Sequence, residues 1–348
     1  MTGRPISLLK IEDVTSDYLV TSLGASITVY TAAQPASITL SETSLSLKPD
    51  EYVRLTATVA PANAGDVTWT SSDESVATVI AGFVTAVSEG TATITASVGT
   101  ATATCEVIVG VGTTYTVNGV SFNMVYVYGG TFLMGAQNTD ASGTNYDADA
   151  FDDEAPVHNV TLSDYQIGET EVTQVLWVAV MGSNPSHFKG DNLPVEKVSW
   201  NDCQTFITKL NALTGKTFRL PTEAEWEFAA RGGMKSLGYK YSGSNTIGDV
   251  AWYTENSSNK TLEVGTKQAN ELGLYDMSGN VWEWCQDWYS SSYYTSAAVA
   301  NPAGSTTGSL RVRRGGSWSS TVRSCRVTFR SNFTPTSTGH NLGLRLAL

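Results

Sequence analysis

Alternating apolar and polar residues mark the chain over residues 36–110. In runs such as Val53–Val59 every second residue is apolar, which is the period of a strand with one buried face. Turn-forming residues at Pro61–Gly65 and Ser71–Ser75 separate these runs. The pattern predicts an all-β sandwich of about seven short strands. Shorter alternating runs predict a small β-rich lead-in over residues 1–35.

Helical periodicity appears in two places beyond a Gly/Thr-rich linker at Gly110–Thr114. Asn201–Thr214 carries apolar residues at helical spacing and is followed by the stop signal Gly215. Thr222–Arg231 opens with a capping box, Thr222 with Glu225. The remainder of residues 115–348 is rich in glycine and aromatic residues. We therefore predict a mixed fold, in which a loop-rich α+β domain follows the β-sandwich.

Charge and hydropathy exclude two classes of partner. The formal net charge is −12, which opposes general binding to nucleic acids or anionic membranes, because phosphate contacts need clustered basic residues. No stretch approaches the ~20 consecutive apolar residues of a membrane span. The first residues lack the apolar core and cleavage site of a signal peptide. We expect no nucleic-acid binding, no membrane insertion and no secretion signal in this chain.

The four cysteines, Cys105, Cys203, Cys285 and Cys325, form no CxxC motif and have no regular spacing. Such cysteines are expected to be buried free thiols. A disulfide that joins Cys285 to Cys325, or Cys203 to Cys285, is the alternative.

A series of motifs follows the linker in a fixed order: Gly129–Gly135, Ala155–His158, Glu171–Gln174, Pro194–Asp202, Arg219–Glu227, Gly273–Trp284 and Arg314–Trp318. Together they resemble the formylglycine-generating enzyme (sulfatase-modifying factor) superfamily across the whole second domain, which implies a variant of the C-type lectin fold. In the first domain, Val67–Trp69, Ser75–Val79 and Gly90–Ile94 resemble the bacterial Ig-like group 2 domain. Such a module is a structural spacer or an adhesion element.

Oxidases of that superfamily hold copper between two cysteines, set five positions apart after the Gly-Gly-Ser turn. Counted from Ser317, these positions are Ser320 and Cys325, and counted back from the C-terminal motif they are Ser317 and Val322. Either register leaves at most one thiol, so copper is not expected. Oxidase activity, with Cys325 as the candidate catalytic residue, is the alternative function.

Related iron-dependent enzymes use three histidines. This chain has only His158, His187 and His340, without a His-x-x-x-His motif, so no iron centre is expected. His158 and His187 are expected to be hydrogen-bonded structural residues.

The segment Asp276–Glu283 matches the superfamily's calcium loop. The resemblance implies a structural calcium ion held by the carboxylates of Asp276 and Glu283 and the backbone carbonyls of Gly279 and Val281, which are hard oxygen ligands. The alternative is that both carboxylates hydrogen-bond the loop backbone. The acidic stretch Asp147–Glu154 is expected to be a solvated loop, with weak cation binding as the alternative.

The last stretch, Arg314–Leu348, begins and ends with motif-like segments, Arg314–Trp318 and Leu342–Leu348, which we call its borders. The residues between these borders show little periodicity. No acidic residue follows Asp287, which predicts an arginine-rich surface at this end. From Ser319 onward there is no Lys, Glu, Gln, Met or Trp. Asn is encoded by AAY, in which Y is a pyrimidine. Replacing one or both adenines of this codon by other bases never gives a codon for any of these five residues. The stretch thus resembles the variable region of a diversity-generating retroelement protein; an ordinary Ser/Thr-rich surface is the alternative.

We therefore expect a non-catalytic ligand- or receptor-binding protein, in which an Ig-like stalk carries a head with a variable C-terminal face. The Tyr/Ser loop Trp288–Thr295 is expected to border this face. The partner would be a protein or glycan receptor on another cell or surface. A phage virion or bacterial surface suits this plan, and a cytoplasmic location is the alternative. The candidate binding residues are Ser319, Ser320, Thr321, Arg323, Thr328, Phe329, Ser331, Phe333, Thr336, Thr338 and His340.

Overall fold

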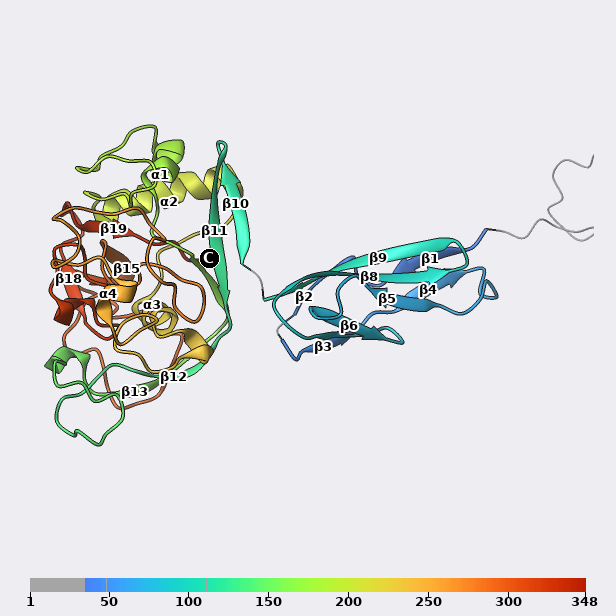
Figure 1. The fold of residues 1–348 in the computed structure, drawn as a ribbon, viewed down its shortest axis with the longest axis horizontal. Helices are drawn as coiled ribbons and strands as arrows, with labels where there is room; N and C mark the ends of the chain where they lie inside the picture. The colour runs from blue at the N-terminus through green and yellow to red at the C-terminus, as the bar shows by residue number, and fades with distance from the viewer. Residues whose placement is uncertain (1–34, 48, 111) are drawn as a thin grey trace, which may run out of the picture.

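The computed structural model describes residues 35–348 except 48 and 111, so the predicted lead-in lies, apart from its last residue, outside the described residues. Figure 1 shows an elongated all-β body that leads into a larger, rounded head. The β body holds β1 to β9, and the head holds all the helices of the described residues together with β10 to β19. The predicted mixed fold is confirmed.

The β body forms three small sheets in its described part, with strand orders β2-β9-β8-β5, β3-β7-β6 and β1-β4. Its strands are β1 (Ser37–Leu40), β2 (Ser44–Leu47), β3 (Tyr52–Arg54), β4 (Ala57–Ala60), β5 (Thr68–Ser71), β6 (Ala77–Ile80), β7 (Phe83–Ala86), β8 (Gly90–Val98) and β9 (Ala101–Val109). Alternate residues of β8 and β9 are buried and form the core with β7, as period-two patterning requires.

The run Val53–Val59, predicted as one strand, belongs to two different sheets. Its first part is in β3, which pairs with β7, and its second part is in β4, which pairs with β1. Between them Leu55 is buried, and its amide donates to the Gly82 carbonyl at 2.8 Å. The chain therefore crosses from one sheet to another without a turn signal, which adds one strand to the number predicted for the described part of this domain.

The head contains short strands and short helices joined by long loops. Its strands are β10 (Thr113–Val117), β11 (Val120–Val127), β12 (Gly130–Met134), β13 (His158–Leu162), β14 (Tyr165–Gly168), β15 (Trp282–Trp288), β16 (Val299–Ala300), β17 (Arg311–Arg314), β18 (Ser331–Phe333) and β19 (Leu342–Leu344). The helices are α1 (Gln174–Met181), α2 (Trp200–Thr214), α3 (Glu223–Ala230) and α4 (Ile247–Val250), with 3-10 turns η1 (Asp152–Glu154), η2 (Gly233–Lys235) and η3 (Val322–Cys325).

Both predicted helices are confirmed. Ser199 caps α2, which ends at Gly215 with φ 67°, and Thr222 caps α3 in the expected box with Glu225. Helix α1 was not predicted, because its sequence is apolar on every side and therefore lacks a helical period. It packs against α2 through Trp177 and Phe206, whose rings stack with centroids 4.8 Å apart.

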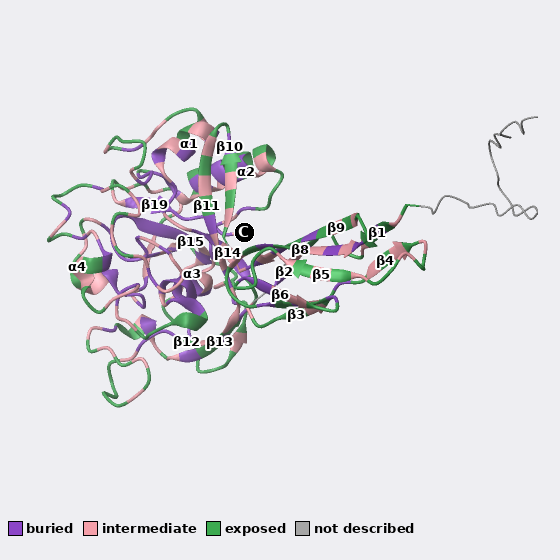
Figure 2. Ribbon diagram, turned by 45° about the vertical axis from the view of Figure 1, so that its right-hand side comes forward, coloured by how far each residue is buried: buried purple, intermediate pink, exposed green. Residues whose placement is uncertain are grey.

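Strand β15 is the centre of the head. The sheet order is β18-β17-β15-β19, and Figure 2 shows β15 buried between the helices and loops around it. The borders of the terminal stretch form its two neighbours: β17 runs antiparallel to β15, and β19 runs parallel to it. Both ends of the stretch are therefore fixed to one buried strand.

The β body meets the head beside its linker. Lys235 Nζ lies 2.6 Å from Glu89 Oε1, and the Tyr128 hydroxyl donates to the Leu47 carbonyl at 3.4 Å. In the described part of the chain, no helix has the length and apolar character needed to cross a membrane.

Candidate binding face

The structure divides the predicted binding residues into three groups by exposure. The exposed group is Ser319, Thr321, Thr336, Thr338 and His340. The half-buried group is Ser320, Arg323, Phe329, Ser331 and Phe333. Thr328 is buried and accepts a hydrogen bond from Arg326 at 2.9 Å. Thr328 therefore supports the fold, and its prediction as a contact residue is wrong because its hydroxyl is already bonded inside the head.

Residues 334–340 alternate between exposed and half-buried positions. Two backbone hydrogen bonds hold this part of the chain: the Asn201 amide donates to Pro335 O at 3.3 Å, and the Lys197 amide donates to Gly339 O at 2.9 Å. Because these bonds use carbonyl groups only, they do not depend on the exposed side chains of Thr336, Thr338 and His340. The backbone is fixed while those side chains face solvent.

The half-buried aromatic residues anchor the face to the core. Phe329 makes an edge contact with Phe151, with ring centroids 5.5 Å apart, and lies 6.0 Å from the ring of Trp282. Phe333 also packs against the core and has Arg313 over its ring at 4.9 Å. Both rings therefore combine a structural contact with a partly accessible surface.

The C-terminal arginines do not form the predicted basic surface. Four of them are buried, each beside a buried glutamate: Arg314 with Glu227, Arg326 with Glu154, Arg330 with Glu223 and Arg345 with Glu283. A guanidinium group can be buried only when a carboxylate and hydrogen-bond acceptors surround it. The sequence showed the excess of arginine but not the acids, which come from distant segments.

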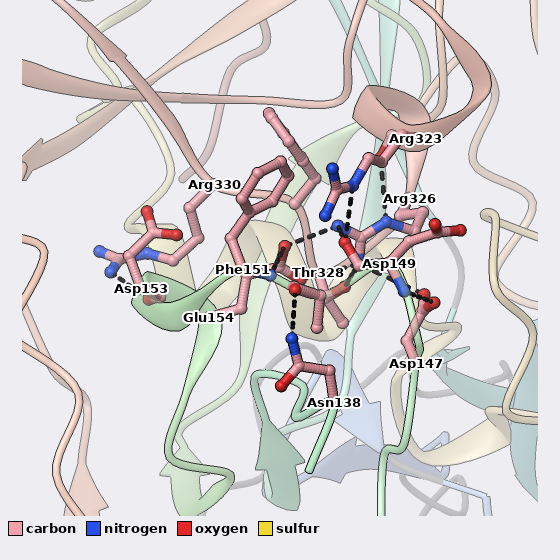
Figure 3. A network of polar contacts seen from close by, with 12 residues as sticks. Asn138, Asp147, Asp149, Phe151, Asp153, Glu154, Arg323, Arg326, Thr328 and Arg330 are labelled. Carbon is pink, nitrogen blue, oxygen red and sulfur yellow. Dashed lines mark hydrogen bonds and ion pairs between the residues drawn. The ribbon is translucent and has the colours of Figure 1, made fainter. Parts of the chain in front are cut away.

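The acidic stretch Asp147–Glu154 supplies one of these acids and is not a solvated loop. Figure 3 shows Arg326 directed at Glu154, whose two oxygens it meets at 2.6 and 2.8 Å. Arg326 also lies 3.3 Å from Asp147, while Arg323 donates to the Asp149 carbonyl and stacks over Phe151. The loop therefore fastens the first part of the terminal stretch to the head.

The Tyr/Ser loop is less free than predicted. Tyr294 is buried, with its ring centroid 4.7 Å from that of His158. The Tyr289 hydroxyl donates to Asp153 at 2.7 Å. These two tyrosines are structural because their rings or hydroxyls are occupied within the head. His158 is buried and hydrogen-bonded to the Pro156 carbonyl, as predicted.

Sequence analysis missed a contact between two histidines at the edge of the face. His187 is exposed rather than structural, and its ring stacks on His340 with centroids 4.3 Å apart and planes 11° apart. Next to them, Trp318 makes an edge contact with Phe188 at 5.6 Å and donates its indole N–H to the His340 carbonyl. No local sequence signal links residue 187 to residue 340.

All four cysteines are free and buried. Burial raises the pKa of the Cys325 thiol to about 12, so the thiolate needed for nucleophilic or copper chemistry is disfavoured. Ser317, Ser320 and Val322, the other positions of the two registers, carry no thiol. The structure gives no support to Cys325 as a catalytic residue.

We expect iodoacetamide to leave Cys325 unmodified in the folded protein at pH 8, because its thiol is buried and protonated. Peptide mass analysis of native and urea-unfolded protein measures this difference. Modification of Cys325 at the unfolded rate without unfolding would contradict the assignment of a structural thiol.

The calcium loop is held by hydrogen bonds and an ion pair. Trp226 Nε1 donates to Glu283 at 2.6 Å, and Arg345 bonds both Glu283 oxygens. Asp276 accepts from the Gly265 amide at 2.7 Å, while its buried Oδ1 has no partner among the described residues. Because Arg345 neutralises Glu283, this conformation does not fit a calcium ion on all four predicted ligands, Asp276, Gly279, Val281 and Glu283.

In the part of the chain that the structure describes, no group of three or more His, Cys, Asp or Glu residues is placed to hold a metal ion. The free Asp276 oxygen is the feature of the loop that favours a cation. Calcium binding stays a prediction.

This architecture defines a class of protein in which an Ig-like domain carries a loop-rich α+β head. Residues 35–109 match the bacterial Ig-like domain (group 2), and residues 116–348 match the sulfatase-modifying factor enzyme 1-like domain. The second match covers more than half of the chain. The protein therefore belongs to the family with a sulfatase-modifying factor enzyme 1-like domain, as the motif order predicted.

Two solved structures resemble the head. Treponema denticola variable protein 1 is 37% identical with a TM-score of 0.60, covering 68% of this chain and 98% of its own. PvdO from Pseudomonas aeruginosa is 26% identical with a TM-score of 0.54, covering 68% and 97%. The likeness to a variable protein agrees with the predicted resemblance of the terminal stretch. The C-type lectin description of the fold stays a prediction.

Two curated relatives of this chain are named for different functions, one as a chaperone and the other as an enzyme. The chaperone protein LppX of Paenibacillus barcinonensis is 38% identical over an aligned length of 238 positions, gaps included, and the match covers 54% of this chain and 81% of the relative. The formylglycine-generating enzyme of Streptomyces coelicolor is 34% identical over an aligned length of 285 positions, gaps included, and the match covers 63% of this chain and 87% of the relative. Family membership alone therefore does not decide between catalysis and binding.

Proposed function

We propose that this protein is a non-catalytic binding protein whose terminal stretch presents a variable contact surface to a receptor. The observation that carries the proposal is the separation of roles within residues 314–348. The buried residues of this stretch are tied to β15 and to the buried glutamates, whereas Ser319, Thr321, Thr336, Thr338 and His340 are exposed, with Ser319 bonded to Asn341 and His340 stacked on His187. Exposed side chains on a fixed backbone can change without loss of the fold.

The partner that suits this surface is a protein or glycan receptor on another cell or surface. The Ig-like domain would act as the stalk that holds the head away from its attachment point, in a bacterial surface or phage virion setting. The likeness to a solved variable protein, which covers 68% of this chain, supports the scaffold on which such a surface would be presented.

A five-site variant tests the proposal: Ser319→Ala, Thr321→Ala, Thr336→Ala, Thr338→Ala and His340→Ala. We expect its melting temperature to fall by no more than about 10 °C, because exposed substitutions typically change stability by less than ~0.5 kcal/mol each, or ~2.5 kcal/mol for all five, and each kcal/mol shifts the melting temperature by about 2–4 °C. In a binding screen of the full chain on bacterial cells and a glycan array, we expect the parent's interactions to be lost or altered.

Thr328→Ala is the control for the screen, because Thr328 lies in the same stretch but is buried. It should lower stability and keep the binding pattern. A five-site variant that unfolds, or one that binds like the parent, would count against the proposal. A near-identical copy of the coding segment for residues 314–348, differing at adenines and lying beside a reverse transcriptase gene, would support diversification.

The second candidate is an oxidase with an altered copper site, which the formylglycine-generating relatives favour. Copper-dependent oxygen consumption with a cysteine-containing sulfatase peptide measures this activity. Turnover that Cys325→Ser abolishes would replace the binding proposal with the catalytic one.

A further inference from the structure

Two arginines beside the variable stretch differ from the four that are buried with glutamates. Arg311 and Arg313 lie on β17 at alternate positions, both half-buried, while Val312 and Arg314 between and after them are buried. No carboxylate of the described residues forms an ion pair with either guanidinium.

Aromatic rings hold both guanidinium groups in place. The Arg311 guanidinium lies 3.5 Å from the ring centroid of Trp288 and 3.9 Å from that of Trp200. Arg313 lies 4.7 Å from the Trp282 ring and 4.9 Å from the Phe333 ring. Contacts of this kind stabilise the cation and limit its rotation, so its hydrogen-bond donors are pre-oriented.

The donors of these groups are only partly used. Arg313 donates from Nε to the Ser331 hydroxyl at 3.2 Å, and Arg311 donates from Nη1 to the Gln286 carbonyl. Arg311 Nε is buried without a partner, whereas the terminal nitrogens of Arg313 and Nη2 of Arg311, which also have no partner among the described residues, are not fully buried. They are therefore accessible. Burial without an acidic neighbour lowers the pKa of Arg313 to about 10, which leaves it charged at neutral pH.

The pair lies within the proposed binding face. In the sheet register Arg311 is opposite Phe333, and Arg313 is opposite Ser331, two residues of the predicted contact set. Half-exposed tryptophan, phenylalanine and arginine side chains on a sheet face are the residue types enriched at the centres of protein interfaces. Because each guanidinium is flanked by rings, a ligand group must approach it at its edge, which suits a planar carboxylate.

We propose that Arg311 and Arg313 bind carboxylate side chains of a protein partner, so that the variable face recognises an acidic protein surface. This inference rests on the proposed function and names the chemistry of its ligand. Arg313, with two free terminal nitrogens, is the principal contact, and the side chains around it adjust the fit.

Binding of fluorescently labelled hexaglutamate to the full chain, measured by anisotropy in about 150 mM salt, tests the inference. We expect binding by the parent, about tenfold weaker binding by Arg313→Gln, and an intermediate affinity for Arg313→Lys, which keeps the charge but not the forked donors. Arg54→Gln is the matched control, because Arg54 also lies over an aromatic ring, that of Phe83 at 5.3 Å, but belongs to the Ig-like domain. It should bind like the parent.

Hexaglutamine and an oligogalacturonate of similar length identify the recognised group. Absence of hexaglutamate binding, equal binding by Arg313→Gln, or binding of the oligogalacturonate alone would overturn the inference. If Arg313→Gln melts at a lower temperature than the parent, its weaker binding could reflect partial unfolding. The hexaglutamate affinities of Arg313→Lys and Arg311→Gln then decide whether the inference stands. The two proposals can fail separately. If the parent does not bind hexaglutamate but the five-site variant still changes the binding pattern on cells and on the glycan array, only this inference fails and the proposed function stands.

Discussion

Replacing Arg326 with methionine is expected to lower the free energy of unfolding of the head by about 3–5 kcal/mol, because it leaves the fully buried Glu154 without a counter-ion. The variant also loses donors to Thr328 and to the Asp149 carbonyl, so the attachment of the acidic loop to the terminal stretch is weakened. Urea unfolding followed by tryptophan fluorescence measures the loss, since Trp69 is the one tryptophan outside the head.

Two further variants make this result specific. Adding Glu154→Leu to Arg326→Met should recover a large part of the loss, because apolar residues of similar volume replace a buried ion pair at little cost. Lys235→Met removes an exposed pair with Glu89, whose side chains are 52% and 47% exposed, and should cost under ~1 kcal/mol. Equal losses for Arg326→Met and Lys235→Met would show that burial of the pair has no special role.

Gly316→Ala should destabilise the head by about 2–4 kcal/mol through two effects that add. Gly316 has φ +77°, which costs an L-residue roughly 1–2 kcal/mol. A Cβ at this position would also lie 2.7 Å from Cys325 Sγ and 2.9 Å from Ser324 O, so the turn and η3 must move apart. Thermal unfolding of the variant measures the combined cost.

Gly182→Ala separates the two effects. Gly182 has φ +80°, close to that of Gly316, but a Cβ there would meet no atom within 4 Å. We expect a loss of only about 1 kcal/mol, which is the conformational part alone. If both alanine variants lose the same stability, the close approach of Gly316 to Cys325 does not constrain the terminal stretch.

The parts of the fold that could be predicted from sequence are those with a local signal. Strand alternation predicted the β-sandwich, caps and apolar spacing predicted α2 and α3, and the resemblance of the motifs indicated the Ig-like domain and the family of the head. Helix α1 lacked a polar face, and the run through Leu55 lacked a turn residue, so neither had a local signal.

The site was harder to predict because its contacts are distant in sequence. Arg326 and Glu154 are 172 positions apart, and Arg330 and Glu223 are 107 apart. Composition alone placed these arginines on the surface, where most arginines lie. The exposed members of the candidate set, such as Thr336 and Thr338, were found because the stretch between the borders has no apolar period.

The attachment of both borders to β15 also affects the length of the terminal stretch. Because β17 and β19 flank the same strand, the chain between them is a closed loop whose ends stay fixed when residues are added. The entropy lost on closing a loop grows only logarithmically with its length, so doubling the length costs about 0.6 kcal/mol. Insertions within residues 334–340, where every second side chain is exposed, therefore cost little free energy, and relatives can differ there in the reach of the surface as well as in its side chains.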